Sequence, residues 1–181
     1  QNLEVRGEVY MPTEAFNKIN SERKAQGEAL YANPRNTAAG SVRQLDPIMT
    51  ASRRLEIYIY ALGYVEGYGM ANEHWEMLRL LGELGFRINP HNKLCRTLEE
   101  VESWYQHWLE HRHELSFQVD GMVVKVNLLE HQAELGNAGR EPRWAIAYKF
   151  PAAQVITRLI DIGINVGRTG SLNPFAILDP V

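Results

Sequence analysis

The sequence predicts an α+β fold in which antiparallel sheets are flanked by helices. Several segments alternate apolar and polar residues with a period of two, and longer segments with a helical period lie between them. Strands with one apolar and one polar face are typical of antiparallel sheets, whereas strands of a doubly wound parallel sheet are apolar on both faces. With 181 residues, 45% of them hydrophobic and 23% charged, we expect one domain plus a fragment of another.

Two strands and a helix are predicted in the first part of the chain. From Leu3 to Met11, apolar positions and glycine alternate with charged positions. Pro12 and Thr13 then begin a polar helix that ends near Gly27. The run from Leu55 to Val65 is rich in tyrosine and β-branched residues and predicts the second strand.

Two helices are predicted next. The first is amphipathic, spans Asn72 to Leu84 and ends at Gly85, with its apolar positions forming core contacts. Thr97 and Glu100 have the spacing of a capping box and begin the second helix. It runs to about Arg112.

Four further strands complete the predicted pattern. Two of them, separated by a short helix, run from Phe117 to Asn127 and from Trp144 to Phe150. After Pro151, two β-rich runs are joined through Gly167 and Gly170.

The net charge of -3 and the single cysteine restrict the classes of function that the chain can have. The charge gives no general attraction to nucleic acid, so any such contact must come from local basic patches. Cys95 alone cannot build a disulfide framework or a multi-cysteine zinc module within this chain, and it suits a reducing, cytoplasmic setting. No apolar run is long enough to cross a membrane, and no signal peptide begins the chain. The first residue is Gln1 rather than Met, and the predicted strand begins already at Leu3. We therefore expect this chain to be a piece of a longer protein.

Two predicted strands each contain a lysine among apolar and small residues. Lys125 lies in "GMVVKV" and Lys149 in "WAIAYKF". Lysine is rarely buried without a partner for its charge. Either side chain alone could reach water from a strand end, but two of them favour a bound anion, and their small neighbours leave room for a ligand. Glu8 lies similarly in mid-strand, where it could accept hydrogen bonds from ribose hydroxyls or be a solvated edge charge.

The stretch "YANPRNTAAGSVRQLD", residues 31–46, contains two arginines suited to bidentate phosphate contacts, Arg35 and Arg43. We expect a helix to begin at its small residues, Ala38 to Ser41, where close backbone approach and the helix dipole favour anions. An ordinary surface helix with solvated arginines is the alternative. His107 and His111 have a spacing that can chelate a metal, but without an acidic or cysteine partner they are interpreted as surface histidines.

Five stretches, in this order, resemble the bacterial NAD-dependent DNA ligases: "LEVRGEVYMP", "YANPRNTAAGSVRQLDP", "FQVDGMVVKVN", "PRWAIAYKFP" and "VGRTGSLNP". The resemblance implies a nucleotidyltransferase (adenylation) domain over residues 1–151 and the first strands of an OB-fold over residues 152–181. It also implies the sealing of nicks in double-stranded DNA during replication and repair, with NAD as the AMP donor. Magnesium would assist the phosphoryl transfer, and zinc would bind to a part of the protein outside this chain. A monomer in the cytoplasm is expected.

The same resemblance assigns roles to individual residues. Glu8 matches a glutamate on the adenosine ribose, and Lys125 and Lys149 match two lysines that neutralise the AMP phosphate. Asp120 matches an acidic residue near the nucleophile and magnesium. Tyr60 matches an aromatic residue stacked on adenine, with Tyr58 on the same predicted strand face as its competitor. Three arginines match contacts to the nick phosphate and to the nicotinamide or adenylate phosphates: Arg35, Arg43 and Arg112.

The nucleophile expected of such a ligase is missing from this chain. It lies in a Lys-x-Asp-Gly motif, and the nearest stretch, Gln118 to Gly121, has a glutamine that cannot form the phosphoramidate. The resemblance places the nucleophile upstream of Leu3, so the chain alone should not self-adenylate. Two alternatives remain: an ATP-dependent ligase or capping-type nucleotidyltransferase, and a non-catalytic module that binds nucleotide or DNA.

Overall fold

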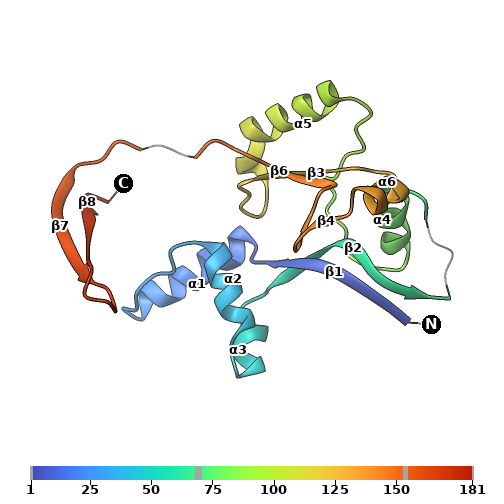
Figure 1. Cartoon of the computed structure of the whole chain (residues 1–181). Coiled ribbons are helices and arrows are strands. Elements are labelled where there is room, and N and C mark those ends of the chain that lie inside the picture. The colour runs from blue at the N-terminus through green and yellow to red at the C-terminus, as the bar shows by residue number, and fades with distance from the viewer. Residues whose placement is uncertain (1, 68–70, 153–154, 181) are drawn as a thin grey trace. The chain divides into compact units, whose positions relative to one another are not determined.

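The computed structural model describes residues 2–67, 71–152 and 155–180, and the chain separates into two units (Figure 1). The first unit spans Gln1–Lys149 and the second Phe150–Val181. Within the described ranges, each of the four two-stranded sheets is antiparallel, and helices connect several of the strands. The α+β class is therefore confirmed. Gln1 and Val181, the outer ends of the two predicted domains, lie outside the described residues.

The first unit begins with a long antiparallel ribbon of β1 (Asn2–Tyr10) and β2 (Glu56–Glu66). Along β1, the apolar and glycine positions from Leu3 to Gly7 are half-buried and the charged positions between them are exposed, as predicted. Three helices connect the two strands: α1 (Thr13–Ala25), α2 (Pro34–Val42) and α3 (Pro47–Ser52).

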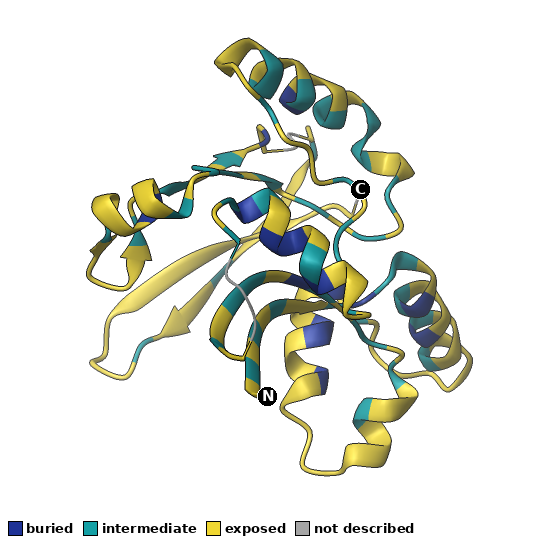
Figure 2. Cartoon of the chain, turned by 90° about the vertical axis from the view of Figure 1, so that its right-hand side faces the viewer, coloured by how far each residue is buried: buried dark blue, intermediate teal, exposed yellow. Residues whose placement is uncertain are grey.

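Two apolar clusters stabilise this unit. In one, α4 (His74–Glu83) packs on β2 through Leu78 and Leu81, which are buried against Ile59. Helix α4 ends at Glu83, one residue before the predicted Leu84, and Gly85 follows with a φ of 91° that favours glycine. The other cluster lies beneath α1 and α2 and contains Met11, Ala15, Ile19 and Ala38. Figure 2 marks the buried residues in dark blue, and several of them lie on helices.

The predicted start of helix α2 is wrong. We expected it at Ala38, but it begins four residues earlier, at Pro34. Asn33 is the N-cap, and its Oδ1 accepts a hydrogen bond of 2.8 Å from the backbone N–H of Asn36. Proline favours the first helical position because its missing N–H would be unpaired there. Ala38 and Ser41 are instead buried in the second half of the helix, so their small size serves packing.

Helix α5 (Leu98–His111) begins as predicted, since Thr97 Oγ1 accepts a hydrogen bond from the Glu100 N–H. The rest of the first unit runs through η1 (Arg112–Glu114), β3 (Gly121–Lys125), α6 (Leu129–Leu135), β4 (Asn137–Ala138), β5 (Glu141–Pro142) and β6 (Ala145–Lys149). The strand predicted from Phe117 to Asn127 is too long at both ends. Its partner β6 offers only five residues for pairing, and Phe117 packs instead against Tyr10 and Tyr58.

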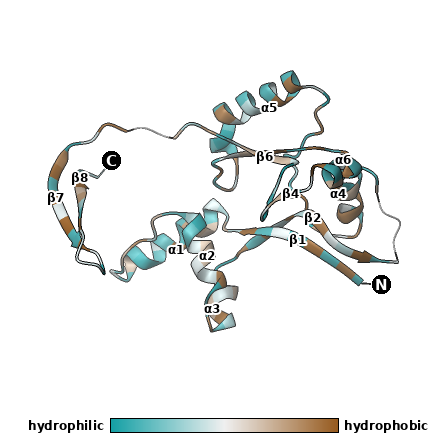
Figure 3. Cartoon of the chain, viewed as in Figure 1, coloured by the Kyte–Doolittle hydropathy of each residue, from teal (hydrophilic) through white to brown (hydrophobic). Residues whose placement is uncertain are grey.

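The second unit contains a hairpin of β7 (Leu159–Val166) and β8 (Leu172–Leu178). The two strands are joined through Gly167 and Gly170 as predicted, and the Gly167 N–H donates to the Ser171 carbonyl oxygen at 2.8 Å. Both strands contain many apolar residues (Figure 3), and the side chains of most of these are exposed. In the described part of the whole chain, no helix is long and apolar enough to cross a membrane.

Candidate functional site

The pairing of β3 with β6 places the two predicted lysines on one face of a sheet. Lys125 lies directly opposite Ala145, and Lys149 lies directly opposite Gly121. Directly opposed residues of antiparallel strands point to the same side. This surface, here called the lysine face, consists of Gly121, Val123, Lys125, Ala145, Ala147 and Lys149. The predicted strand faces are therefore confirmed, and the register brings the faces of the two strands together.

Helix α5 contacts one end of the other side of the same sheet. The ring of Tyr148 stacks on that of Tyr105 with 3.8 Å between ring centres, and Tyr148 donates to a Glu102 carboxylate oxygen at 2.8 Å. The buried Tyr105 hydroxyl donates to the Lys149 carbonyl oxygen at 3.0 Å. The centre of the lysine face is open, since Val123 is 59% exposed.

Gly121 allows the two strands of the lysine face to approach closely. A Cβ atom added at Gly121 would lie 2.5 Å from the Tyr148 carbonyl oxygen and 2.6 Å from the Lys149 Cα. Both are backbone atoms, so a side chain at this position would displace β6.

At one end of the lysine face, two cations share a carboxylate oxygen. Lys149 Nζ lies 3.3 Å and Arg35 Nη1 3.5 Å from Asp120 Oδ2. Arg35 belongs to the first turn of α2, and Asp120 directly precedes β3. The Lys149 side chain is 70% exposed, so our expectation that it is a buried lysine is wrong. It reaches water because β6 ends at this residue and its side chain extends past the edge of the sheet.

At the other end of the lysine face, Lys125 contacts Tyr60 of β2. The ammonium nitrogen lies 4.9 Å from the ring centre and donates to the Tyr60 carbonyl oxygen at 3.3 Å. The pairing register explains why this oxygen is free to accept: Arg6 pairs with Ala61 and Gly7 with Ile59, so Tyr60 is the extra residue of a β-bulge. The extra residue of a bulge is left out of the ladder, and its side chain is re-aimed.

The surroundings of Lys125 change two pKa values. Burial lowers the pKa of Lys125 below that of an exposed lysine. Burial, as the largest cause, and the nearby charge of Lys125 together lower the pKa of His74 to about 4, whereas a hydrogen bond with the Tyr60 backbone opposes the shift. His74 is therefore neutral at pH 7, which leaves Lys125 as the cation beside Tyr60.

Tyr60 and its competitor Tyr58 have different surroundings. The Tyr58 ring stacks on Tyr10 with 4.8 Å between ring centres and also meets Phe117, so it is part of an aromatic cluster. Tyr60 is 43% exposed and carries the Lys125 ammonium against its ring. Of the two, Tyr60 has the more accessible ring.

The remaining predicted residues lie on separate elements. Glu8 is exposed on β1 and pairs across the ribbon with Tyr58. Arg43 caps the C-terminal end of α2 and is exposed, and Arg112 begins η1 and is half-buried. The structure assigns no role to these three side chains.

The sequence did not predict the hydrogen-bonded polar residues around the end of β3. Among these are His74 and Gln132, which are buried close to the end of β3, and Asn127, which bonds to the start of α4.

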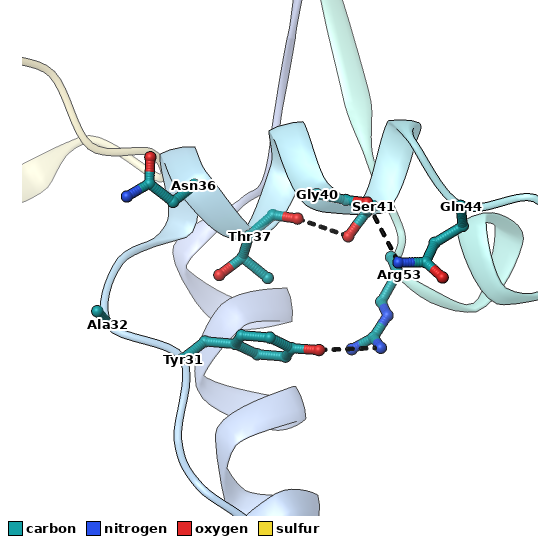
Figure 4. Close-up of a pocket in the computed structure, with 8 residues that line it drawn as sticks. All are labelled: Tyr31, Ala32, Asn36, Thr37, Gly40, Ser41, Gln44 and Arg53. Atoms are coloured by element: carbon teal, nitrogen blue, oxygen red, sulfur yellow. Dashed lines mark hydrogen bonds between the residues drawn. The ribbon is translucent and has the colours of Figure 1, made fainter. Parts of the chain in front are cut away.

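A small cavity lies away from the lysine face. It has a volume of about 160 Å³ and is lined by Tyr31, Ala32, Asn36, Thr37, Gly40, Ser41, Gln44 and Arg53 (Figure 4). Arg53 Nη2 lies 3.3 Å from the Tyr31 hydroxyl across its mouth. The cavity is smaller than the roughly 300–1,000 Å³ usual for ligand pockets, and none of the predicted site residues lines it.

Comparison with known proteins identifies the family. Residues 1–153 match the sequence model of the NAD-dependent DNA ligase adenylation domain. A protein named DNA ligase from Dehalococcoides mccartyi is 58% identical over 179 residues, which are 99% of this chain and 26% of that relative. DNA ligases of Desulforudis audaxviator and Thermotoga neapolitana are 54% and 50% identical over the same shares of both chains.

The chain therefore belongs to the NAD-dependent DNA ligase adenylation domain family. It spans about a quarter of the length of the curated relatives that it matches.

Proposed function

We propose that the chain is part of an NAD-dependent DNA ligase and supplies part of its adenylate-binding site. Residues 1–151 form the larger part of the adenylation domain, and residues 152–181 form the first strands of an OB-fold. The longer protein seals nicks in double-stranded DNA during replication and repair, first carrying AMP on a lysine and then on the 5′-phosphate of the nick. We expect it to act as a monomer in the cytoplasm, and the single cysteine of this chain is in keeping with a reducing setting.

The observation that carries this proposal is the lysine face, with one ammonium group at each end of an open sheet surface. Four residues along a strand span roughly 13 Å, and lysine side chains extending from both ends can converge on one phosphate group. The side chains between the two lysines are small and the surface there is open, which suits a flat ligand. Tyr60 presents its exposed ring for the adenine, and Glu8 the carboxylate for the ribose hydroxyls.

Phosphate can replace Asp120 between Lys149 and Arg35. Both cations already share one oxygen of the Asp120 carboxylate, and all three side chains are mostly exposed. Exposed pairs of this kind contribute about 0–1 kcal/mol each, so a doubly charged phosphate can displace them without a large loss. Arg43 and Arg112 would then serve the nick phosphate or the nicotinamide part of NAD.

Magnesium fits this site only as a partner of the substrate phosphates. No group of three or more His, Cys, Asp or Glu side chains suited to a metal occurs among the described residues. Mg²⁺ commonly uses one or two carboxylates together with substrate phosphates, and Asp120 can be that carboxylate. Bound there, the ion would neutralise charge developing on the phosphate. The zinc of such ligases would lie outside this chain.

The choice of AMP donor tests the proposal against its closest alternative. The longer protein, given a nicked duplex, magnesium and either NAD or ATP, should seal the nick with NAD alone. Sealing with ATP alone would assign the chain to an ATP-dependent ligase or a capping-type enzyme. Binding of nucleotide or DNA with neither adduct nor sealing would favour a non-catalytic binding module.

A further inference from the structure

The backbone directly after Lys125 is fixed by two hydrogen bonds. The Val126 N–H donates to the Trp144 carbonyl oxygen at 2.9 Å, which continues the pairing of β3 with β6. The Val126 carbonyl oxygen accepts from Gln132 Nε2 at 2.6 Å. Gln132 is buried in α6, and its Nε2 also lies 3.4 Å from His74 Nδ1. Both backbone polar groups of Val126 are therefore hydrogen-bonded.

The next residue, Asn127, ties this backbone to the start of helix α4 through three hydrogen bonds. Its carbonyl oxygen accepts from the His74 N–H at 2.7 Å, and its Oδ1 accepts from the Trp75 N–H at 3.0 Å. Its Nδ2 donates to Glu73 Oε2 at 2.7 Å.

Asn127 thereby acts as a cap supplied from a distant part of the chain. The first N–H groups of a helix have no partner within it and are usually satisfied by the N-cap side chain. Glu73 is the N-cap of α4, but its side chain makes no cap hydrogen bond and instead accepts from Asn127. The amide of Asn127 suits this position because it accepts and donates at the same time.

Helix α4 completes the connection between Lys125 and its partner Tyr60. Its buried residues Leu78 and Leu81 pack against Ile59, the neighbour of Tyr60 on β2. Asn127 is two residues from Lys125 and bonds to the first turn of that helix. A fixed α4 therefore sets the position of β2 relative to the end of β3.

We propose that Asn127 is a positioning residue that holds the Lys125 ammonium group against Tyr60 through its hydrogen bonds to Glu73 and α4. The consequence for ligand binding rests on the proposed function, in which Lys125 contacts the adenylate phosphate. Without Asn127, the Lys125 ammonium group would sample many positions, and a phosphate would have to order it on binding.

A pair of exchanged side chains tests this proposal. Asn127→Asp puts a carboxylate opposite Glu73 and removes the donor, so the pair should repel. Adding Glu73→Gln restores one hydrogen bond, since the new amide can donate to the new carboxylate while that carboxylate still accepts from the Trp75 N–H. The double variant also keeps the net charge of the parent chain, so its recovery would reflect geometry rather than charge.

Two properties of the 181-residue chain are measured for the parent and for each variant. The nuclear Overhauser contact between the Lys125 ε-protons and the Tyr60 ring protons reports the position of Lys125 without any ligand. The dissociation constant of AMP reports its consequence. We expect Asn127→Asp and Asn127→Ala to lose the contact and to weaken AMP binding about tenfold, and the double variant to recover both.

Asn20→Ala is the matched control. Asn20 is also partly buried and makes two side-chain hydrogen bonds, both with the backbone of Tyr31, but on the far helix α1. This variant should lose stability yet keep the contact between Lys125 and Tyr60 and the affinity for AMP. Thermal unfolding of every variant separates a general loss of stability from a local one.

Different results would contradict the positioning role of Asn127 and the proposed phosphate contact of Lys125. If Asn127→Ala remains folded and keeps the contact between Lys125 and Tyr60, Asn127 does not position the lysine. The same conclusion holds if the double variant fails to recover a contact that Asn127→Asp has lost. If the contact behaves as expected but Lys125→Ala does not change AMP binding, the positioning role stands and the proposed role of Lys125 fails.

Discussion

The ammonium nitrogen of Lys125 lies 4.9 Å from the centre of the Tyr60 ring and 3.3 Å from the Tyr60 carbonyl oxygen. The lysine is thus oriented by its own domain before any ligand arrives, by a cation–π contact and a hydrogen bond. A preorganised, half-buried cation interacts more strongly with a phosphate than a freely moving one in water. We expect the chemistry of the site to depend on this arrangement.

Replacing either lysine of the lysine face should impair formation of the enzyme–AMP adduct in the longer protein. Loss of a charge contact that strengthens in the transition state costs about 3 kcal/mol, or about a hundredfold in rate. Lys125→Ala and Lys149→Ala are therefore expected to slow adduct formation by this factor, measured as label transferred from NAD, while circular dichroism shows an intact fold. Lys93→Ala is the control, because Lys93 also contacts an aromatic ring, that of Trp104, away from this face. Near-normal adduct formation by either lysine variant would refute its role.

Gly121→Ala should destabilise the first unit. The added methyl group would collide with the backbone of β6 at Tyr148 and Lys149, and overpacking of this kind costs about 1–3 kcal/mol. Chemical denaturation measures the change. Gly40→Ala is the matched control, because no atom lies within 4 Å of a Cβ at that helical position, and alanine should stabilise the helix by about 0.5–1 kcal/mol. Equal stability of the two variants would contradict the close approach of the strands.

His74 should make the stability of the chain depend on pH between about 6.5 and 4. Its pKa is lowered from 6.5 to about 4 in the folded state, first by burial and then by the charge of Lys125. The unfolded state therefore binds more protons in this range, and the free energy of unfolding falls as the pH falls. Comparing the parent chain with His74→Gln by urea denaturation at several pH values isolates this effect from the titration of carboxylates. Identical slopes against pH would show that His74 does not titrate in this way.

The strand faces could be predicted from the sequence because the side-chain period of a strand is fixed. Alternation alone placed Lys125 with Gly121, and Lys149 with Ala147. The register between the two strands could not be predicted, since it depends on how β3 and β6 meet across a helix and a short hairpin. That register is what places the two lysines at opposite ends of one face.

Other features of the site could not be predicted from the sequence because they depend on contacts between distant segments. The bulge at Tyr60 is a mismatch between two strands distant in sequence, so neither strand shows it alone. The ion pairs of Asp120 with Arg35 and Lys149 join three elements. The start of α2, in contrast, could have been predicted, because Asn33 followed by Pro34 is a strong signal for the N-terminus of a helix. Asp46 followed by Pro47 is the same signal at the start of α3, a helix that we did not predict.

The 181-residue chain, incubated with NAD and magnesium, should gain no adenylate. Burial lowers the pKa of Lys125, which favours its reactive neutral form, but its nitrogen is directed at the Tyr60 carbonyl oxygen. The nitrogen of Lys149 lies against Asp120. Attack would also require an amine in line with the departing nicotinamide mononucleotide. Intact-mass spectrometry detects the adduct, and a mass gain of one adenylate that Lys125→Ala or Lys149→Ala abolishes would mean that the nucleophile lies in this chain.

The most direct test of the lysine face is a titration of the chain with AMP, followed by NMR signals of the lysine ε-groups and the Tyr60 ring. Adenosine, which lacks the phosphate, is the matched ligand. AMP should shift the signals of Lys125, Lys149 and Tyr60, whereas adenosine should shift the signals of Tyr60 alone. The combined Lys125→Ala and Lys149→Ala variant should bind AMP no better than adenosine. AMP that binds while both lysine signals stay unchanged, or with equal affinity to the double variant, would contradict the proposed role of the lysine face.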